Sequence, residues 1–286
     1  MDPEEAARLL VSEYGRMADT YDRSAAPCYS RAADRLLHLA NVGPGDAILD
    51  LGCGSGNAAF LAAGVIGDSG TVVGVDLAED MVALAKAKAA AMGLRNVGFE
   101  VMDVRDLEFE DGSFDAAISC FGVPALGYRR SLREAYRVLH PGGRFVSCDW
   151  AGPGSVAGRA LRESIARHPI SDPPEELRRL LEARDVLRDA EEARGYGKPE
   201  EMLEVLGGIG FRDARTRSET VPVTFPSPDA YIAYTASWGD REREFAAMRA
   251  EDRIAVHREF REGVAGLMSP EGLVVPWELQ FTFARK

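Results

Sequence analysis

Three closely spaced glycines follow directly on an apolar run at 47–51: Gly52, Gly54 and Gly56. Glycine is needed where a backbone must turn sharply or let a ligand approach to van der Waals distance, so this loop predicts a bound cofactor. Loops that bind dinucleotides carry the pattern G-x-G-x-x-G, and here Asn57 stands at the position of the third glycine. The loop therefore disfavours a dinucleotide without excluding one.

Two further apolar runs end in acids. Asp76 closes the run 71–76, where a carboxylate can accept hydrogen bonds from both ribose hydroxyls of an adenosine. Asp103 follows the next run and precedes Val104. An acid there can accept the adenine amino hydrogen while the next backbone N–H donates to the ring. These residues favour a cofactor that contains adenosine, a property that NAD and S-adenosylmethionine (SAM) share.

These candidate residues lie in a repeated alternation of apolar runs and helical stretches. Continuous apolar runs, as opposed to alternating ones, are typical of parallel strands that helices cover on both faces. The clearest helix is predicted at 79–92, with Met81 and Leu84 facing inward and Gly93 as its C-terminal stop. We expect a doubly wound α/β sheet whose first five strands are 47–51, 71–76, 97–102, 114–119 and 144–148.

The chain is expected to divide into four segments. Residues 1–40 are predicted to form helices that close over the site, and 41–150 to form the cofactor-binding core. The alternation then stops, and 151–196 is predicted to be a helical lid, because ligands of open α/β sheets bind at the carboxyl ends of the strands, where this segment begins. Residues 197–286 are predicted to complete the core, with strands at 218–225 and 277–283 and helices at 228–237 and 241–266.

The sequence resembles the class I SAM-dependent methyltransferases, in particular the group related to the ubiquinone and menaquinone C-methyltransferases (methyltransferase type 11). The resemblance covers most of the chain outside the predicted lid. The resemblance rests on four motifs that occur in this order, at spacings that alternate strand and helix, and together they identify the family more specifically than any one motif does. The motifs are LDLGCGSGN at 49–57, VDLAEDM at 75–81, DGSFD at 111–115 and EAYRVLHPGG at 134–143.

The resemblance implies a Rossmann-like fold, with a seven-stranded, mostly parallel sheet of order 3-2-1-4-5-7-6 and an antiparallel last strand. It also implies SAM as the cofactor and S-adenosylhomocysteine (SAH) as the product. By this resemblance the methionine part of SAM would lie along Gly52 and Gly54, and Asp76 would hold the ribose. Leu77 and Met81 would flank the adenine or ribose, and the adenine edge would be read by Asp103 and Val104. Ser119 and Cys120 would lie beside the sulfonium and the acceptor, and Tyr21 would close over the cofactor.

The predicted activity is transfer of a methyl group from SAM to a small-molecule acceptor. Because the sulfonium methyl is already electrophilic, the protein mainly has to align the acceptor and exclude water. The sequence shows no obvious general base, and His168 and His257 are weak candidates for one. Methylation of oxygen, carbon and nitrogen all stay open.

Aromatic residues near predicted strand ends favour an apolar or aromatic acceptor, of a kind found in secondary metabolism: Phe121, Tyr128, Trp150 and Trp238. Fold does not fix function, so one alternative is a SAM-binding protein that catalyses a cyclisation or is not catalytic. Turnover of SAM would separate the two. A second alternative, an NAD-dependent oxidoreductase, is disfavoured by Asn57 and Asp103.

The composition excludes several classes of partner. Lys and Arg total 34 against 46 Asp and Glu, and the net charge of −12 repels nucleic acid and anionic membrane surfaces. The first residues are acidic where a signal peptide would be basic, and no apolar run approaches the roughly 18–20 residues that span a bilayer, so a cytoplasmic location is expected. The four cysteines form no C-x-x-C pair, so no metal is expected. We expect a monomer or a homodimer.

Overall fold

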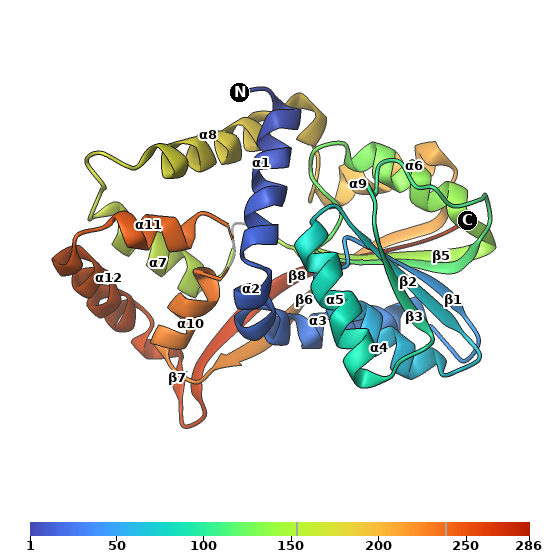
Figure 1. Cartoon of the computed structure of the whole chain (residues 1–286), viewed down its shortest axis with the longest axis horizontal. Coiled ribbons are helices and arrows are strands. Elements are labelled where there is room, and N and C mark those ends of the chain that lie inside the picture. The colour runs from blue at the N-terminus through green and yellow to red at the C-terminus, as the bar shows by residue number, and fades with distance from the viewer. Residues whose placement is uncertain (153, 238) are drawn as a thin grey trace.

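A mixed sheet forms the centre of the molecule (Figure 1). The computed structural model describes residues 1–152, 154–237 and 239–286, and within them the sheet has eight strands. The strands run in the order β3-β2-β1-β4-β5-β8-β6, and β7 pairs with β8 outside this path. Their bounds are β1 Ala47–Leu51, β2 Thr71–Asp76, β3 Val97–Val101, β4 Phe114–Cys120, β5 Leu139–Trp150, β6 Arg212–Phe225, β7 Met268–Ser269 and β8 Gly272–Arg285.

The predicted fold class is confirmed, with differences in detail. Strands β1 to β5 pair in parallel, and β8 runs antiparallel to both β5 and β6. β8 takes the place expected for the seventh strand, because the two-residue β7 was not predicted. β6 and β8 begin earlier than predicted, at Arg212 and Gly272, since they pair along their length from Arg212–Arg285 to Phe225–Leu273. The hydrogen bonds of this ladder pair the backbone N–H and C=O groups of polar residues as well, so the strands extend beyond the apolar runs from which they were predicted.

Helices cover both faces of the sheet. One face carries α3 (Ala26–Ala40), α4 (Asn57–Ile66) and α5 (Glu79–Met92), and the other carries α6 (Tyr128–Val138) and α9 (Pro199–Ile209). Successive side chains of a strand point to opposite faces, so Ile48 packs in the cluster under α3 and α4, whereas Leu49 packs in the cluster under α6 and α9. The helix predicted at 79–92 is confirmed as α5.

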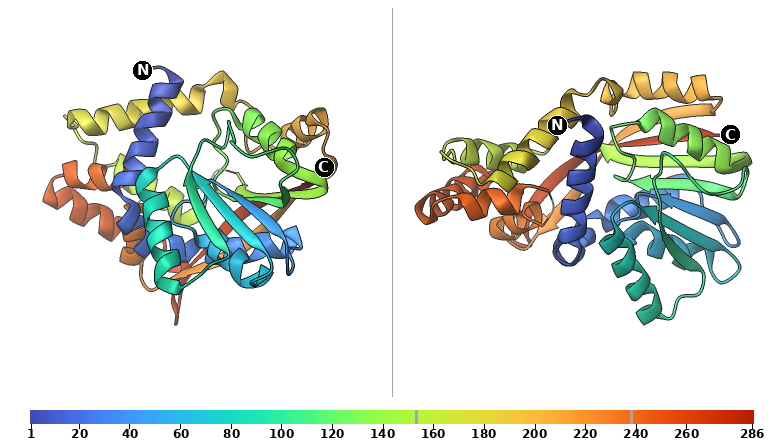
Figure 2. Two further views of the ribbon diagram at one scale, coloured as in Figure 1. Left: turned by 45° about the vertical axis from the view of Figure 1, so that its right-hand side comes forward. Right: turned by 45° about the horizontal axis from the view of Figure 1, so that its top comes forward.

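A group of helices lies to one side of the sheet, at the left of Figure 1 and again beside the sheet in both views of Figure 2. It contains α10, α11 and α12 with the two helices of the predicted lid segment, α7 and α8, which η1 (Glu191–Ala193) follows. α7 packs against α12, and α8 packs against α1. Their bounds are α1 Pro3–Arg16, α2 Ala18–Ser24, α7 Val156–Ala166, α8 Glu175–Asp189, α10 Pro228–Thr235, α11 Arg241–Ala247 and α12 Ala250–Gly263.

The prediction of one helix at 241–266 is wrong, because α11 and α12 are separate. Extended backbone at Met248 (ψ 149°) and Arg249 (ψ 150°) divides them, and the Met248 side chain is buried in the larger core cluster. Burying a Met side chain stabilises a fold by about 1.5–3 kcal/mol, which offsets the interrupted helical hydrogen bonds. Among the described residues, no helix is long and apolar enough to cross a membrane.

Candidate active site

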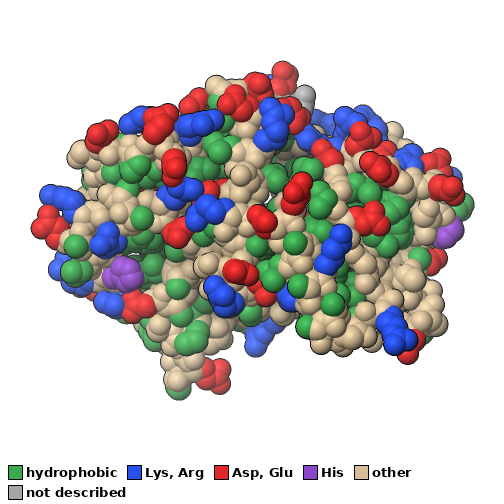
Figure 3. All heavy atoms as spheres, in the orientation of Figure 1, with side chains coloured by type: hydrophobic (Ala, Val, Ile, Leu, Met, Phe, Trp, Pro, Cys, Tyr) green, Lys and Arg blue, Asp and Glu red, His purple; other side chains and the backbone are tan. Residues whose placement is uncertain are grey.

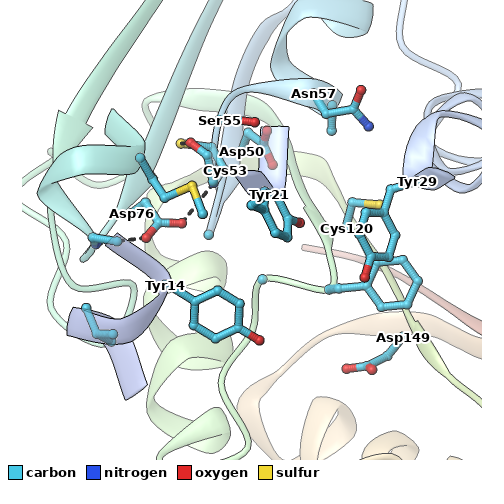
Figure 4. A pocket seen from close by; sticks show the side chains of 18 of the residues that line it. Tyr14, Tyr21, Tyr29, Asp50, Cys53, Ser55, Asn57, Asp76, Cys120 and Asp149 are labelled. Atoms are coloured by element: carbon cyan, nitrogen blue, oxygen red, sulfur yellow. Dashed lines mark hydrogen bonds between the residues drawn. The ribbon is translucent and has the colours of Figure 1, made fainter. Parts of the chain in front are cut away.

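A cavity of about 320 Å³ opens where the carboxyl ends of β1, β2, β4 and β5 meet. This is the edge at which open α/β sheets bind their ligands. The loop after β1 forms its floor, and side chains from α1, α2 and α3 cover it (Figure 4). Of the residues predicted from the sequence, this cavity brings together Tyr21, Gly52, Gly54, Asp76, Met81 and Cys120.

The glycine loop has two different constraints. Gly52 (φ +71°) lies so close to the loop after β4 that an added Cβ would meet the Gly122 Cα at 2.5 Å. Gly54 (φ +53°) is instead open, because a Cβ there would meet a single neighbour within 4 Å, the Tyr21 ring at 4.0 Å. Gly52 is therefore required by the packing of two backbones, whereas Gly54 leaves space that a bound molecule can fill.

Asp76 is fixed at the end of β2 by backbone donors. The Gly54 N–H donates to Oδ2 at 2.8 Å and the Ala78 N–H donates to Oδ1 at 2.9 Å, as the dashed lines in Figure 4 show. Burial raises the pKa of the Asp76 carboxyl, and these N–H donors oppose that rise without cancelling it. The carboxylate keeps lone pairs on the cavity side that can accept hydrogen bonds from a ligand's hydroxyl groups.

Asp50 is a second carboxyl on the cavity wall, and the sequence analysis did not identify it. Its Oδ2 atom is buried and makes no hydrogen bond within the described structure. Burial, together with the nearby Asp76 charge, raises the pKa of the Asp50 carboxyl to about 7. The signal was present in the sequence, because Asp50 is the one charged residue in the apolar run 47–51.

Aromatic side chains form the other wall of the cavity. Tyr14 and Tyr21 meet edge to face with centroids 6.4 Å apart, and Tyr21 stacks on Tyr29 at 6.2 Å. Phe121 has φ 61°, a backbone conformation that bulky residues rarely adopt, and its ring packs against Trp150 at 4.9 Å. The wall presents flat apolar surface opposite the glycine loop, as Figure 4 shows for the tyrosines.

Four predicted binding residues do not line this cavity. Val104 is buried in the second core cluster, and Ser119 is buried with its hydroxyl donating to the Leu51 carbonyl at 2.9 Å. Asp103 binds Arg105 through three side-chain contacts of 2.8–3.1 Å, and Arg105 lowers the pKa of the Asp103 carboxyl although burial opposes it. Leu77 is exposed and, with Arg105, lines a shallower adjoining cavity that shares Ala78 with the first.

The two histidines suggested as bases lie elsewhere. His168 contacts Glu259 at 3.0 Å and Asp252 at 3.4 Å, both on α12. His257 contacts Asp229 at 2.8 Å. Neither ring is on the wall of the cavity, because His257 lies on α12 and His168 follows the end of α7, both in the helical group beside the sheet. Within the described residues, no cluster of His, Cys, Asp and Glu is arranged to hold a metal ion.

A second cavity of about 410 Å³ is lined by the segment after β5, together with α7, and by α10. Its wall includes four aromatic side chains, Trp150, Tyr231, Tyr234 and Trp277, and Trp150 also belongs to the wall of the first cavity. Three arginines and one aspartate add polar groups: Arg162, Arg184, Arg241 and Asp240. The two cavities thus adjoin at Trp150, which lies on the wall of both.

The aromatic residues predicted from the sequence to lie near the acceptor occupy different parts of the structure. Phe121 and Trp150 line the first cavity. Tyr128 is buried in the second core cluster, and its hydroxyl donates to the Arg194 carbonyl at 3.4 Å. Trp238 lies outside the described residues. The second cavity is built mostly from residues after 150, which carried no motif in the sequence.

Comparisons with known proteins bear on the same region. A family model described as a methyltransferase domain matches residues 48–143, which include the glycine loop and Asp76. The chain is 30% identical over 253 residues to nocamycin O-methyltransferase of Saccharothrix syringae, which covers 85% of each chain. It is also 30% identical over 159 residues to a demethylmenaquinone methyltransferase of Symbiobacterium thermophilum, covering 54% of this chain and 63% of that enzyme.

Solved structures share the fold. The YcgJ protein of Bacillus subtilis superposes with a TM-score of 0.56 at 21% sequence identity, over 90% of this chain and 98% of that one. At that identity the likeness concerns the arrangement of helices and strands. The glycine loop and the edge of the sheet therefore belong to a fold that the two proteins share. The likeness gives no information about the acceptor.

Proposed function

Because the chain belongs to the class I SAM-dependent methyltransferases, we propose that it methylates an oxygen atom of an apolar, aromatic small molecule. The family supplies the reaction, which is transfer of a methyl group from SAM to a small-molecule acceptor. The observation that carries the cofactor's proposed position is the hydrogen bond from Gly54 to Asp76, which joins the glycine loop to an acid on the wall of the same cavity.

The side chains of this cavity suit the groups of SAM. Asp50 has a buried oxygen without a partner, which suits the ammonium of the methionine part. Gly54 leaves open space beside the backbone, and Asp76 has acceptor sites for ribose hydroxyls. We propose that the methionine part lies along Gly52 and Gly54 with its ammonium at Asp50, that Asp76 holds the ribose, and that Tyr21 covers the cofactor.

The adenine end is proposed to extend toward the adjoining cavity. Met81 lies on the wall of the first cavity, and Leu77 with Arg105 lines the adjoining cavity that shares Ala78 with the first. In this proposal Leu77 and Met81 flank the ring, and Asp103 with the Val104 N–H reads its edge. Arg105 must then share the Asp103 carboxylate with the adenine amino group, since it holds both oxygens of that carboxylate.

The acceptor is proposed to occupy the second cavity and to reach past Trp150. The lid segment supplies Ser155 and Leu161 to this cavity, and α10 supplies Tyr231 and Tyr234, so an aromatic or otherwise flat apolar molecule fits its walls. Methylation of oxygen is supported by the similarity to nocamycin O-methyltransferase, and so is a role in secondary metabolism. In this proposal 151–196 acts as a lid over the acceptor.

SAM, when bound, supplies an electrophilic methyl group on its sulfonium. The work left to this chain is to bind, to orient and to exclude water. Cys120 and the Phe121 ring, at the end of β4, lie between the glycine loop and Trp150 and so form the surface along which an acceptor is aligned. Ser119 supports that surface, because its hydroxyl accepts from the Gly122 N–H at 3.2 Å.

Further properties are proposed from charge. The chain carries a net charge of −12, and on the face drawn in Figure 3 basic and acidic side chains are interspersed. That face shows no broad positive area that would attract phosphates. We propose that the enzyme works in the cytoplasm as a monomer or homodimer, without nucleic acid or membrane as a partner.

Calorimetric titration with SAM, SAH and NAD, followed by mass spectrometry of reactions with 2-naphthol as an aromatic hydroxyl acceptor, tests the proposal. We expect binding of both sulfur ligands, no binding of NAD, and formation of the methyl ether. Binding of SAM without any methylated product would instead favour a SAM-binding protein that is not a methyltransferase toward this acceptor class. Binding of NAD alone would overturn the cofactor's placement.

A further inference from the structure

Asp149 is a carboxyl at the meeting point of the two cavities. It lies at the end of β5 and lines the first cavity, and the next residue, Trp150, lines both. Figure 4 shows Asp149 across the cavity from Asp76, on the side of Tyr29 and Cys120. Its position therefore suits contact with the acceptor better than contact with a cofactor at the glycine loop.

Among the described residues, the cavity wall holds three carboxyls, and two of them have other roles. Asp50 and Asp76 lie at the ends of β1 and β2 beside the glycine loop. The tyrosines on the wall stay protonated at neutral pH and so cannot take up a proton, since burial raises the pKa of Tyr21 and of Tyr29 well above the usual value. Asp149 is thus the remaining carboxylate that can take a proton from an acceptor.

Two donors hold the Asp149 carboxylate in place. The Trp150 N–H donates to Oδ1 at 2.7 Å, and the Tyr196 hydroxyl, from the turn before α9, contacts Oδ2 closely. The same hydroxyl lies 2.7 Å from the Val123 carbonyl. Tyr196 therefore fixes the carboxylate from a segment 47 residues away in sequence, at the end of the predicted lid.

We propose that Asp149 is the general base that deprotonates the acceptor hydroxyl, and that Tyr196 is its positioning residue. The inference rests on the proposed function. Asp149 takes the proton of the acceptor O–H, and an oxygen lone pair forms the new O–CH3 bond. The S–CH3 bond breaks with its electron pair left on sulfur. A carboxylate and a sulfonium thus become a carboxylic acid and a thioether, and the acid later returns its proton to water.

Other titratable groups surround Asp149. They are Tyr196 on the turn before α9, Cys148 on β5, Cys120 on β4 and Tyr29 on α3, with Asp50 and Asp76 across the cavity. Burial raises the pKa of the Asp149 carboxyl, and the Tyr196 hydrogen bond opposes that rise. The base form is lost as the pH falls below this pKa, so activity should decline toward acid pH. Replacing Tyr196 by Phe should move that decline to higher pH.

The test compares two acceptors of different acidity. 2-Naphthol, which like tyrosine ionises near pH 10, needs a base, whereas 4-nitrophenol is already ionised at about pH 8. With both substrates saturating, D149N should lower kcat for 2-naphthol by about 100-fold or more and leave kcat for 4-nitrophenol within about fivefold. Y196F should shift the acid side of the pH profile for 2-naphthol upward. SAH affinity, measured by calorimetry, should stay unchanged in both variants.

The control is D111N, which makes the same chemical change at an exposed turn residue and should alter nothing measured here. Equal losses with both acceptors in D149N, or an unmoved pH profile in Y196F, would overturn the role of Asp149 while leaving the proposed function intact. A wild-type enzyme that binds SAM but methylates neither phenol would overturn the proposed acceptor class and this inference together. The pKa of Asp50 in the free protein also lies near 7, so a pH profile of the wild type alone does not identify the titrating carboxyl. The shift in Y196F decides between the two, because Tyr196 contacts Asp149.

Discussion

The backbone N–H of Gly54 donates a 2.8 Å hydrogen bond to the carboxylate of Asp76, which ties the loop after β1 to the end of β2. Both residues lie on the wall of one cavity. The contact means that the residue proposed to hold the ribose also sets the shape of the loop proposed to hold the methionine part. Changes at either position are therefore expected to act on cofactor affinity first.

Replacing Asp76 by Ala should weaken SAH binding about tenfold to hundredfold. Hydrogen bonds to a charged group contribute about 1.5–3 kcal/mol, and the variant also frees the Gly54 N–H. Isothermal titration calorimetry gives the affinity directly. D111A, at an exposed aspartate outside the cavity, serves as the control. An unchanged dissociation constant for D76A would contradict the proposed ribose site.

Gly54→Ala and Gly93→Ala form a matched pair. Both glycines have positive φ (+53° and +67°), and neither would bring a new Cβ closer than 4.0 Å to any atom beyond its chain neighbours. Both variants should lose about 1 kcal/mol of stability, because Ala is disfavoured at positive φ. G54A alone should also weaken SAH binding, since its methyl group enters the cavity. Thermal unfolding and calorimetry together check this, and equal SAH affinities would argue against a ligand at Gly54.

Asp50 should make SAH binding release protons near neutral pH. Its pKa is about 7 in the free protein, and an ammonium placed at its unpaired oxygen would lower that pKa, so about half a proton should leave at pH 7. Calorimetry in buffers of different ionisation enthalpy measures the number. D50N should bind SAH without this release. Equal proton release by wild type and D50N would show that another group is responsible.

Asp50 should also shape the pH dependence of stability in the free enzyme. The pKa of the Asp50 carboxyl in the folded protein, about 7, lies above its usual value of 3.8, so the folded state holds the proton more tightly. The contribution of this group to the free energy of unfolding is therefore fully present below about pH 4. It is lost as the pH rises to about 7, and the loss is at most about 4 kcal/mol. D50N should flatten this decline. Urea unfolding at several pH values tests it, and parallel curves for the two proteins would contradict it.

Thr235→Trp should block the acceptor without touching the cofactor. Thr235 lies on α10 and lines the second cavity, so an indole there fills space proposed for the acceptor. We expect the KM for 2-naphthol to rise about tenfold or more, with SAH affinity unchanged. Ala233→Trp, at an exposed position of the same helix outside the cavity, is the control. Similar kinetics for both variants would place the acceptor elsewhere.

Glu13 should stabilise the contact of α1 with the neighbouring helices. Its buried carboxylate accepts from Arg16 at 2.6 Å and from Arg243 of α11 at 2.9 Å. Burial raises its pKa, but the two arginines outweigh burial and lower it, so this stabilisation is lost as the pH falls below the unfolded value near 4.5. E13Q should cost about 1 kcal/mol in chemical unfolding, because both arginines are partly exposed and keep Glu242 and Glu176 as partners. E5Q, at a half-exposed position of α1 where the carboxylate lies 3.6 Å from Arg179, should cost little.

The core of the fold was predictable because each of its signals is local. The apolar runs 47–51 and 71–76 are short and uninterrupted, which fits parallel strands, and Gly52 and Gly54 mark a backbone that turns sharply. The break between α11 and α12 was not predictable in this way. The residues 241–266 are compatible with one helix, and burial of Met248 against distant residues decided otherwise.

The candidate site was predictable in part for the same reason. Asp76 and Cys120 end strands and therefore had to lie at one edge of the sheet. Asp149 and Tyr196 carried no signal, because an acid near a strand end and a tyrosine in a turn are ordinary until their oxygens meet. The second cavity had no motif either, since α7 and α10 contribute three residues each and α8 and β8 one each, all of common type.

The sequence by itself determined the order of strands and helices, the family, and the loop at which the cofactor is proposed to bind. These depend on the spacing of neighbouring residues and on the backbone freedom of Gly54, which are local properties. The tertiary structure decided which side chains face the acceptor and which carboxyl is free to act as a base. The pairing of Asp149 with Tyr196 and the unpaired oxygen of Asp50 depend on burial and on long-range packing, and those exist only once the chain has folded.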